Sequence, residues 1–138
     1  VHNGIEYGLM HAYAEGYELL MAKDIVEDVP GAFKAWTRGT VVRSWLLDLL
    51  VDALEKNPTL EDVSDYTVDS GEGKWTVEEA ITLDVPMPVI SASLFARFAS
   101  RQAVSPAMQA VAALRGEFGG HQVMTVAEGE ALKGKPKP

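Results

Sequence analysis

Several features that would place the chain in particular functional classes are missing from it. It has no cysteine, which excludes a disulfide framework and thiolate chemistry and favours a reducing compartment such as the cytoplasm. No apolar run approaches the roughly 20 residues of a membrane-spanning helix, and no signal peptide opens the chain. The formal net charge is -8, so we expect neither nucleic acid nor an acidic membrane surface as a partner.

Apolar residues recur at helical spacing along most of the 138 residues, and no stretch alternates in the manner of a strand. With 47% hydrophobic and 23% charged residues, the chain is long enough to bury a core as one domain. The predicted fold class is therefore all-α. Helices are expected over about 3–23, around Phe33 and Trp36, from a cap at Thr40 to Asn57, over about 89–102, and over about 106–115.

The segment 63–74 has no helical pattern and is rich in Asp, Ser and Gly, so we expect it to be the longest ordered loop. Thr76 and Glu79 after it have the spacing of a capping box, which would begin the next helix. A glycine pair ends the last predicted helix. We therefore expect a helical domain over residues 1–122 and a C-terminal tail over residues 123–138.

Four polar or aromatic side chains gather at the start of the first predicted helix: His2, Asn3, Glu6 and Tyr7. Spacings of three and four residues let all four project toward one side of the helix. Free backbone N–H groups and the helix dipole at this end favour an anionic ligand, such as a polyhydroxy acid with which Glu6 could exchange a proton. The structural alternative is a capping Asn3, a packed Tyr7 and two solvated side chains.

Three further clusters combine glycine or basic residues in patterns that suit a bound anion. Gly71 and Gly73 lie before a capped helix, where the backbone could approach a phosphate or simply connect two helices. Arg97 lies inside an apolar helical stretch and could snorkel to the surface or pair with a buried anion. Arg115 and His121 flank a glycine turn, where they could cap a helix end or clamp a phosphate. No set of His, Asp and Glu has metal-ligand spacing, so no metal is expected.

Together these clusters resemble the 6-phosphogluconate dehydrogenases. The opening V-H-N-G-I-E-Y-G is similar to the active-site helix motif of that family. Later motifs of the family have counterparts in the same order in G-K-W-T at 73–76, F-A-R at 95–97 and R-G-E-F-G-G-H at 115–121. V-V-R-S at 41–44 also resembles the family's I-I-R-S. The matches cover residues 1–121, and they imply the helical C-terminal domain of the short type of this enzyme.

The resemblance implies a role for each of these residues in the decarboxylating enzyme. Glu6 would be the general acid that protonates the enediol left after decarboxylation. Substrate-binding roles fall on His2, Asn3, Tyr7, Arg97, Arg115 and His121. His2 and Asn3 would contact the hydroxyls and the carboxylate of the substrate. Tyr7 and Arg97 would contact its phosphate, together with Arg115 and His121 from the partner subunit of a homodimer. The implied reaction is the NAD- or NADP-dependent oxidative decarboxylation of 6-phosphogluconate to ribulose 5-phosphate in the pentose phosphate pathway.

This sequence also departs from the family pattern. The family's base lysine would precede Val1, and the G-x-G-x-x-G nucleotide domain is absent. NAD or NADP would therefore be bound mainly by that N-terminal domain, and the isolated chain is expected to be inactive. Ser70 and Glu72 stand where the longer enzymes have lysine and threonine, which removes one expected phosphate contact. Two alternatives stay open: a domain of another β-hydroxyacid dehydrogenase, such as the 3-hydroxyisobutyrate type, and a purely structural helical dimerisation module.

Overall fold

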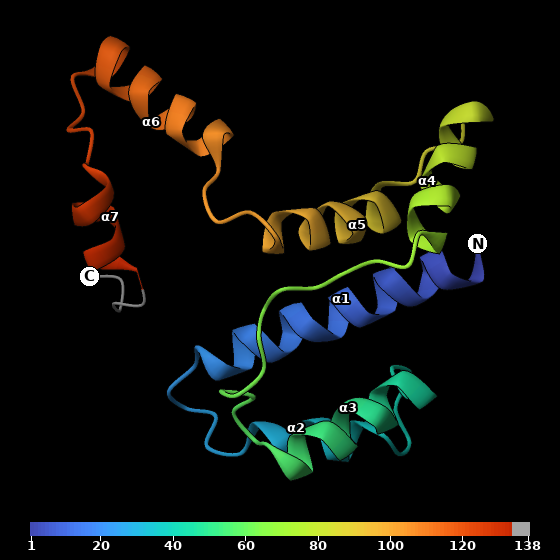
Figure 1. Cartoon of the computed structure of the whole chain (residues 1–138). Coiled ribbons are helices and arrows are strands. Elements are labelled where there is room, and N and C mark those ends of the chain that lie inside the picture. Colours follow the sequence, from blue (N-terminus) through green and yellow to red (C-terminus); the bar gives the residue numbers. More distant parts are fainter. Residues whose placement is uncertain (134–138) are drawn as a thin grey trace. The chain divides into compact units, whose positions relative to one another are not determined.

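The computed structural model describes residues 1–133, which form seven α-helices and no strand (Figure 1). The prediction of an all-α fold is confirmed over these residues. The chain divides into two compact units, Val1–Arg101 and the part from Gln102 onward, whereas the domain bounds expected from the sequence, 1–122 and 123–138, stay a prediction. Within the described residues, no helix has both the length and the apolar character needed to cross a membrane.

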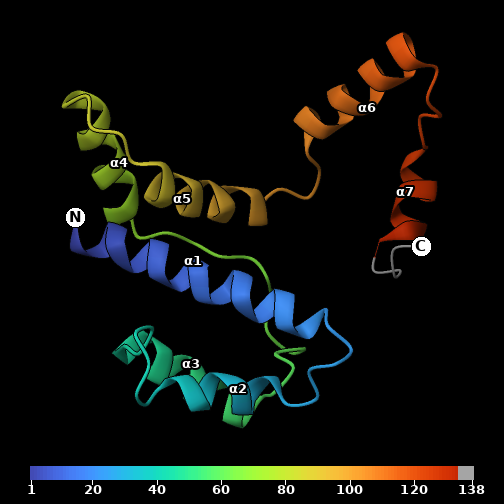
Figure 2. The ribbon, with the colours of Figure 1, turned by 180° about the vertical axis from the view of Figure 1, so that it is seen from behind.

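The first unit is built around its longest helix, α1 (His2–Met21). Two helices pack along one side of α1, namely α4 (Glu72–Thr82) and α5 (Pro88–Ser100). On the other side lie α2 (Val29–Trp36) and α3 (Trp45–Lys56), as Figures 1 and 2 show from opposite directions. The N-terminal end of α1, which carries the first predicted cluster, therefore lies beside α4.

The main hydrophobic core lies where α2 and α3 meet α1. Phe33, Leu47 and Leu54 are at most 1% exposed, and Val29 and Val51 complete the buried cluster. Three partly buried side chains of α1 pack against it: Tyr13, Tyr17 and Leu20. Full burial of one such aliphatic or aromatic side chain contributes about 1.5–3 kcal/mol, so this cluster attaches the α2–α3 pair to α1.

Helix α3 begins later than its predicted cap at Thr40. The N-cap is Ser44, whose hydroxyl accepts a hydrogen bond from the Leu47 N–H at 3.0 Å. The Thr40 hydroxyl instead donates to the Trp36 carbonyl at 2.6 Å, at the end of α2. Ser and Thr are both good caps by composition, but Ser44 has the extended backbone that an N-cap requires. The helix end predicted at Asn57 is confirmed.

Helices α1 and α4 approach each other through two glycines. An ideal Cβ at Gly73 would lie 2.4 Å from Cε2 of Tyr7, and one at Gly4 would lie 2.8 Å from Cγ2 of Thr76. These distances leave no room for a side chain at either position in a packed interior. The first turn of α4 therefore lies directly on α1, and the Tyr7 ring is buried by the contact.

The same contact explains two wrong predictions about the preceding segment. Helix α4 begins at Glu72, so the loop expected over 63–74 ends at Gly71, whose φ of 104° suits glycine. Thr76 does not start a capping box, because it is 5% exposed inside the helix and its hydroxyl donates to the Glu72 carbonyl at 2.8 Å. Packing of Gly73 and Thr76 on α1 requires both residues to be helical, which overrides the local capping pattern.

The second unit begins with α6 (Pro106–Gly119). Ser105 is its N-cap, and the Ser105 hydroxyl accepts from the Met108 N–H at 3.3 Å. The start predicted at Ser105 and Pro106 is confirmed, whereas the helix runs beyond its predicted end at Arg115. It stops at the C-cap Gly120, which has a φ of 60°, a left-handed conformation that glycine adopts without strain.

The expected tail over 123–138 contains a helix that the sequence analysis did not predict, α7 (Val126–Leu132). A capping box begins α7, in which Thr125 and Glu128 each satisfy a backbone N–H of the other. The signal was therefore present in the sequence as a Thr and a Glu three residues apart. The last part of the expected tail, residues 134–138, lies outside the described residues.

Replacing Gly73 by Ala is expected to lower the free energy of unfolding by about 1–3 kcal/mol, because the added methyl group would overlap the Tyr7 ring. Gly16→Ala is the matched control, since Gly16 lies in α1 with nothing within 4 Å of the added Cβ. That exchange should raise the same free energy by about 0.5–1 kcal/mol. Urea unfolding of the 138-residue chain, followed by circular dichroism, measures both. Equal effects of the two substitutions would show that α4 does not lie this close to α1.

Candidate functional site

The N-terminal turn of α1 brings three of the predicted residues together. Nδ1 of His2 lies 3.3 Å from Oδ1 of Asn3 and 3.7 Å from Oε1 of Glu6. The side chains of His2 and Glu6 are 85% and 38% exposed, so both can be reached from solvent. The N-cap of the helix is Val1. Asn3 therefore does not cap the helix, as the structural alternative had it.

Tyr7 lies at the contact between α1, α4 and α5. Its ring packs against Gly73, and Cζ of Arg97 lies 3.6 Å from the ring centroid. A guanidinium over an aromatic face is favourable by about 0.5–2 kcal/mol. The residue is 5% exposed, and its buried hydroxyl has no hydrogen-bond partner within the described residues. Buried polar atoms without a partner are rare and costly. Tyr7 therefore packs in the core with its ring and has a hydroxyl that could still bind a ligand.

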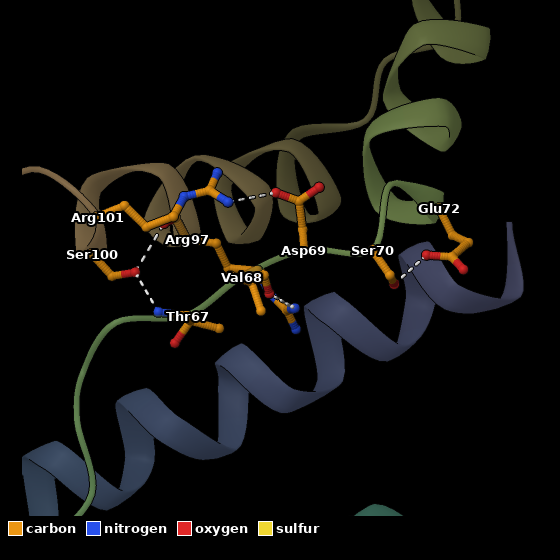
Figure 3. Close-up of polar contacts among 8 residues, drawn as sticks. All are labelled: Thr67, Val68, Asp69, Ser70, Glu72, Arg97, Ser100 and Arg101. Atoms are coloured by element: carbon orange, nitrogen blue, oxygen red, sulfur yellow. Dashed lines mark hydrogen bonds and ion pairs between the residues drawn. The ribbon is translucent and has the colours of Figure 1, made fainter.

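Arg97 is half-buried, and its position differs from both alternatives drawn from the sequence. Besides the ring contact, its Nη1 donates to the Val68 carbonyl at 3.2 Å (Figure 3). The ion pairs formed by the described residues do not include Arg97. A guanidinium has five N–H donors, so one backbone acceptor leaves most of them for a ligand. Arg97 is thus held by uncharged groups and keeps its positive charge unpaired in this part of the chain.

A cavity of about 490 Å³ runs along α1 and α5 and has Tyr7 and Arg97 in its wall. Its polar lining also includes His11 and Glu18 of α1, Ser93 of α5, and Asp65 and Thr67 of the loop after α3. The three residues of the N-terminal turn of α1 do not line this cavity. Among the described residues, His, Asp and Glu side chains do not form a group of three or more that could hold a metal ion. Tyr7 therefore lies where the N-terminal cluster and the cavity adjoin.

A carboxylate of the chain itself occupies the N-terminus of α4. Glu72 is the first residue of α4 and accepts a hydrogen bond from the Ser70 hydroxyl (Figure 3). The hydrogen bond from Ser70 is the main reason why the pKa of Glu72 is lowered from its ordinary value. An ionised carboxylate at a helix N-terminus interacts favourably with the helix dipole. Glu72 thus places a negative charge at this helix end, which disfavours the binding of a phosphate there.

The structure adds two residues that the sequence analysis missed. Nη1 of Arg101 lies 3.0 Å from Oδ2 of Asp69 (Figure 3). Arg101 follows Arg97 by four residues, which places both on one face at the end of α5. That spacing is the signal that could have identified Arg101. Nothing in the local sequence marks Asp69 as its partner, because the two residues belong to different segments.

Arg115 and His121 belong to the second unit, where both are exposed. Arg115 lies within α6 instead of after it, and His121 follows the C-cap Gly120. The first unit brings Tyr7 and Arg97 together without them. Their part in a phosphate clamp therefore stays a prediction.

Comparison with known proteins identifies the family. A sequence model described as "6-phosphogluconate dehydrogenase, C-terminal domain" matches residues 1–133. The chain belongs to the 6-phosphogluconate dehydrogenase family. The assignment predicted from the four motifs is thereby confirmed, and the alternative of a 3-hydroxyisobutyrate-type domain is set aside.

Relatives in the 6-phosphogluconate dehydrogenase family extend well beyond the matched region. A Haloferax volcanii protein named "6-phosphogluconate dehydrogenase, NAD(+)-dependent, decarboxylating" is 44% identical over 124 residues, 89% of this chain and 42% of its own length. A relative from Bacillus subtilis (strain 168) is 44% identical over 121 residues, 88% of this chain and 41% of its own. Another protein of that strain, named "6-phosphogluconate dehydrogenase, NADP(+)-dependent, decarboxylating", is 36% identical over 111 residues, 72% of this chain and 23% of its own. The chain spans about two fifths of the length of the first two, 42% and 41%.

Tyr7→Phe is expected to leave the free energy of unfolding unchanged or to raise it by up to about 1 kcal/mol, because it removes a buried hydroxyl without a partner. Tyr13→Phe is the matched control on the same helix, since the Tyr13 hydroxyl donates to the Val42 carbonyl at 2.6 Å and lies 2.9 Å from Oγ of Ser44. Loss of these bonds should lower the free energy of unfolding by about 1 kcal/mol. Urea unfolding of both variants checks the difference. A Tyr7 variant as destabilised as the Tyr13 variant would contradict the expectation.

Proposed function

We propose that this chain is the substrate-binding and dimerisation domain of an NAD- or NADP-dependent 6-phosphogluconate dehydrogenase. The complete enzyme would oxidise and decarboxylate 6-phosphogluconate to ribulose 5-phosphate in the pentose phosphate pathway of the cytoplasm. The observation that carries the proposal is the pair of Tyr7 and Arg97. The Tyr7 ring, whose buried hydroxyl has no partner among the described residues, lies against an unpaired guanidinium, and both residues line one cavity. The family match over residues 1–133 supports it.

Tyr7 and Arg97 suit the phosphate of the substrate. A phosphate dianion is bound best by charged and directional donors, and arginine N–H groups with a tyrosine hydroxyl supply both. Because the chain has a net charge of -8, such an anion needs a local positive charge to overcome the overall field. The Tyr7 ring and the Val68 carbonyl hold the guanidinium before a ligand arrives, which reduces the entropy lost on binding.

The N-terminal turn of α1 suits the other end of the substrate. The rise of α1 from His2 to Tyr7 is about 7.5 Å, similar to the length of an extended six-carbon chain. A 6-phosphogluconate molecule lying along this turn would place its phosphate at Tyr7 and its hydroxyls and carboxylate at His2 and Asn3. The positive end of the α1 dipole also favours the carboxylate.

Glu6 would supply the proton that completes the reaction. Loss of carbon dioxide from a β-keto acid leaves an enediol, because the ketone accepts the electron pair of the broken bond. The Glu6 side chain is 38% exposed and lies 3.7 Å from His2, so it can donate a proton to the enediol carbon and regain one from solvent. This last step of the reaction needs a transferable proton at this position.

The nicotinamide cofactor does not fit the residues of this chain. A dinucleotide site of the common type needs a glycine-rich turn between a strand and a helix, and the described residues form helices without a strand. We therefore assign NAD or NADP to a separate nucleotide-binding domain of the complete enzyme. This chain would contribute mainly to the binding of the sugar phosphate.

The second unit would supply the rest of the phosphate clamp from a partner subunit. Helix α6 has no buried residue. Four of its apolar side chains are between 43% and 80% exposed and recur at helical spacing: Met108, Val111, Leu114 and Phe118. Such a stripe is suited to burial against a second copy of the chain. Because Arg115 and His121 lie beside and just after this stripe, a homodimer formed through it would carry two cations toward its partner.

In the complete enzyme, Glu6→Gln is expected to lower kcat by about 100-fold or more while the Kd for 6-phosphogluconate changes little. The amide keeps the hydrogen bonds of the site but has no transferable proton. Glu15→Gln is the matched control, because Glu15 also lies one helical turn after a histidine of α1. Its Oε1 is 3.3 Å from Nε2 of His11. That variant should turn over normally. Steady-state kinetics and calorimetric binding measure both constants, and a near-normal kcat for Glu6→Gln would remove Glu6 from the mechanism.

A shared phosphate clamp predicts that two defective subunits can restore one intact site. Arg97→Ala and Arg115→Ala should each weaken binding of 6-phosphogluconate by about 10–100-fold, since each removes a charge-assisted contact of roughly 1.5–3 kcal/mol. A heterodimer of the two variants has one site with both arginines. Mixing them under conditions of subunit exchange should therefore restore activity at low substrate concentration.

The control for this mixture combines Arg97→Ala with the double variant Arg97→Ala/Arg115→Ala, because none of its sites contains both arginines. Activity that returns only in the first mixture supports the shared clamp. If neither mixture regains activity although every variant dimerises, each chain builds its own site and the shared clamp is wrong. An unmodified complete enzyme that does not turn over 6-phosphogluconate would instead favour the purely structural dimerisation module.

A further inference from the structure

Three consecutive residues of the loop before α4 are each attached to the end of α5. The contacts pair Thr67 with Ser100, Val68 with Arg97, and Asp69 with Arg101 (Figure 3). The donor–acceptor distances are 3.1, 3.2 and 3.0 Å in that order. The middle contact reaches Arg97, so the loop and the proposed phosphate site are directly connected.

Asp69 and Arg101 form the best shielded ion pair of the described residues. The Arg101 and Asp69 side chains are 26% and 11% exposed, whereas those of the Lys34–Glu55 pair are 67% and 49% exposed. Solvent screens an exposed pair, which then contributes little. Partial burial strengthens the attraction and makes the loss of one partner costly. The Arg101 guanidinium is also held by the Phe98 ring, with Cζ 5.1 Å from the centroid.

The direction of the Arg97 guanidinium depends on this loop. A free arginine side chain has many rotamers, and contact with the Tyr7 ring fixes its distance from the ring more than the direction of its N–H groups. The Val68 carbonyl supplies that direction, because a hydrogen bond weakens steeply away from linearity. Residues 57–71 form neither helix nor strand, so contacts to α5 determine where the carbonyl lies.

We propose that Asp69 and Arg101 are positioning residues for Arg97. Their ion pair holds the loop against α5, which keeps the Val68 carbonyl in place to accept from Arg97 and aims the remaining N–H groups at a bound phosphate. Neither Asp69 nor Arg101 lines the cavity that has Tyr7 and Arg97 in its wall, so the pair acts through Arg97 and not on the ligand. The identity of the ligand as 6-phosphogluconate rests on the proposed function.

The first test compares Arg101→Leu with Arg101→Lys in the complete enzyme. Arg101→Leu should raise the Kd for 6-phosphogluconate about 10-fold with kcat at saturating substrate nearly unchanged, because only the aim of a binding group is lost. Arg101→Lys retains the charge and should stay within about 3-fold of the original Kd. Glu55→Gln removes an exposed ion pair elsewhere in the same unit and should have no effect. If Arg101→Leu fails to fold by circular dichroism, Asp69→Asn takes its place with the same expectation.

A double-mutant cycle separates positioning from a general structural role. In an Arg97→Ala background, Arg101→Leu should change the Kd by less than about 2-fold, because no guanidinium is left to position. In the unchanged background, Arg101→Leu should likewise change the Kd for unphosphorylated gluconate by less than about 2-fold, because that ligand has no phosphate for Arg97 to bind. A similar loss of affinity with and without Arg97 would overturn the proposal.

Amide hydrogen exchange keeps this inference separate from the proposed function, because it needs no ligand. In the 138-residue chain, exchange of the Thr67 N–H should be faster in Arg101→Leu than in the unchanged chain and unaffected in Glu55→Gln. Unchanged exchange in Arg101→Leu would overturn the positioning role even in an active enzyme. Faster exchange in a protein whose complete form does not bind 6-phosphogluconate would support the hold on the loop and refute the proposed function.

Discussion

The ring of Tyr7 lies against Gly73 of α4 and beside the guanidinium of Arg97 of α5, so one side chain of α1 joins three helices. This arrangement is possible only because Gly73 and Gly4 let the first turn of α4 lie directly on α1. The same contact buries the Tyr7 hydroxyl and gives Arg97 a surface on which to rest. The polar site therefore follows from a packing constraint, since wider spacing of the helices would let water reach the hydroxyl and release the arginine.

The charges near this contact are arranged so that Arg97 stays unpaired among the described residues. Asp65 and Glu18 line the same cavity as Arg97 but form no ion pair with it. Asp69 and Glu72, of the loop and of α4, are engaged by other groups. Asp69 pairs with Arg101, and Glu72 is engaged by the Ser70 hydroxyl and by the N-terminus of its own helix. Asp69 and Glu72 thus each have a partner other than Arg97. Arg97 forms no ion pair among the described residues, which leaves its charge for an external anion.

The candidate site could be predicted in part because its motifs are local. Spacings of three and four residues placed His2, Asn3 and Glu6 on one helical turn, and the structure brings them together. Contacts between segments were missed, above all that of Asp69 with Arg101, because no local pattern connects residues on a loop and on a later helix. Arg97 was singled out as a cation in an apolar stretch, yet its contact with Tyr7 joins two helices and follows from no spacing in either.

What the sequence by itself determined is the all-α class, most helix positions and the family, because helical periodicity and short motifs are properties of neighbouring residues. Where two local signals compete for the same helix start, only the tertiary structure decided between them. Ser44 caps α3 in place of Thr40, and Thr76 is buried within α4 instead of starting it. The physical reason is the same in both cases: several residues can satisfy a helix end at similar cost. The choice among them falls to the packing of one helix on another, which depends on residues far away in the chain.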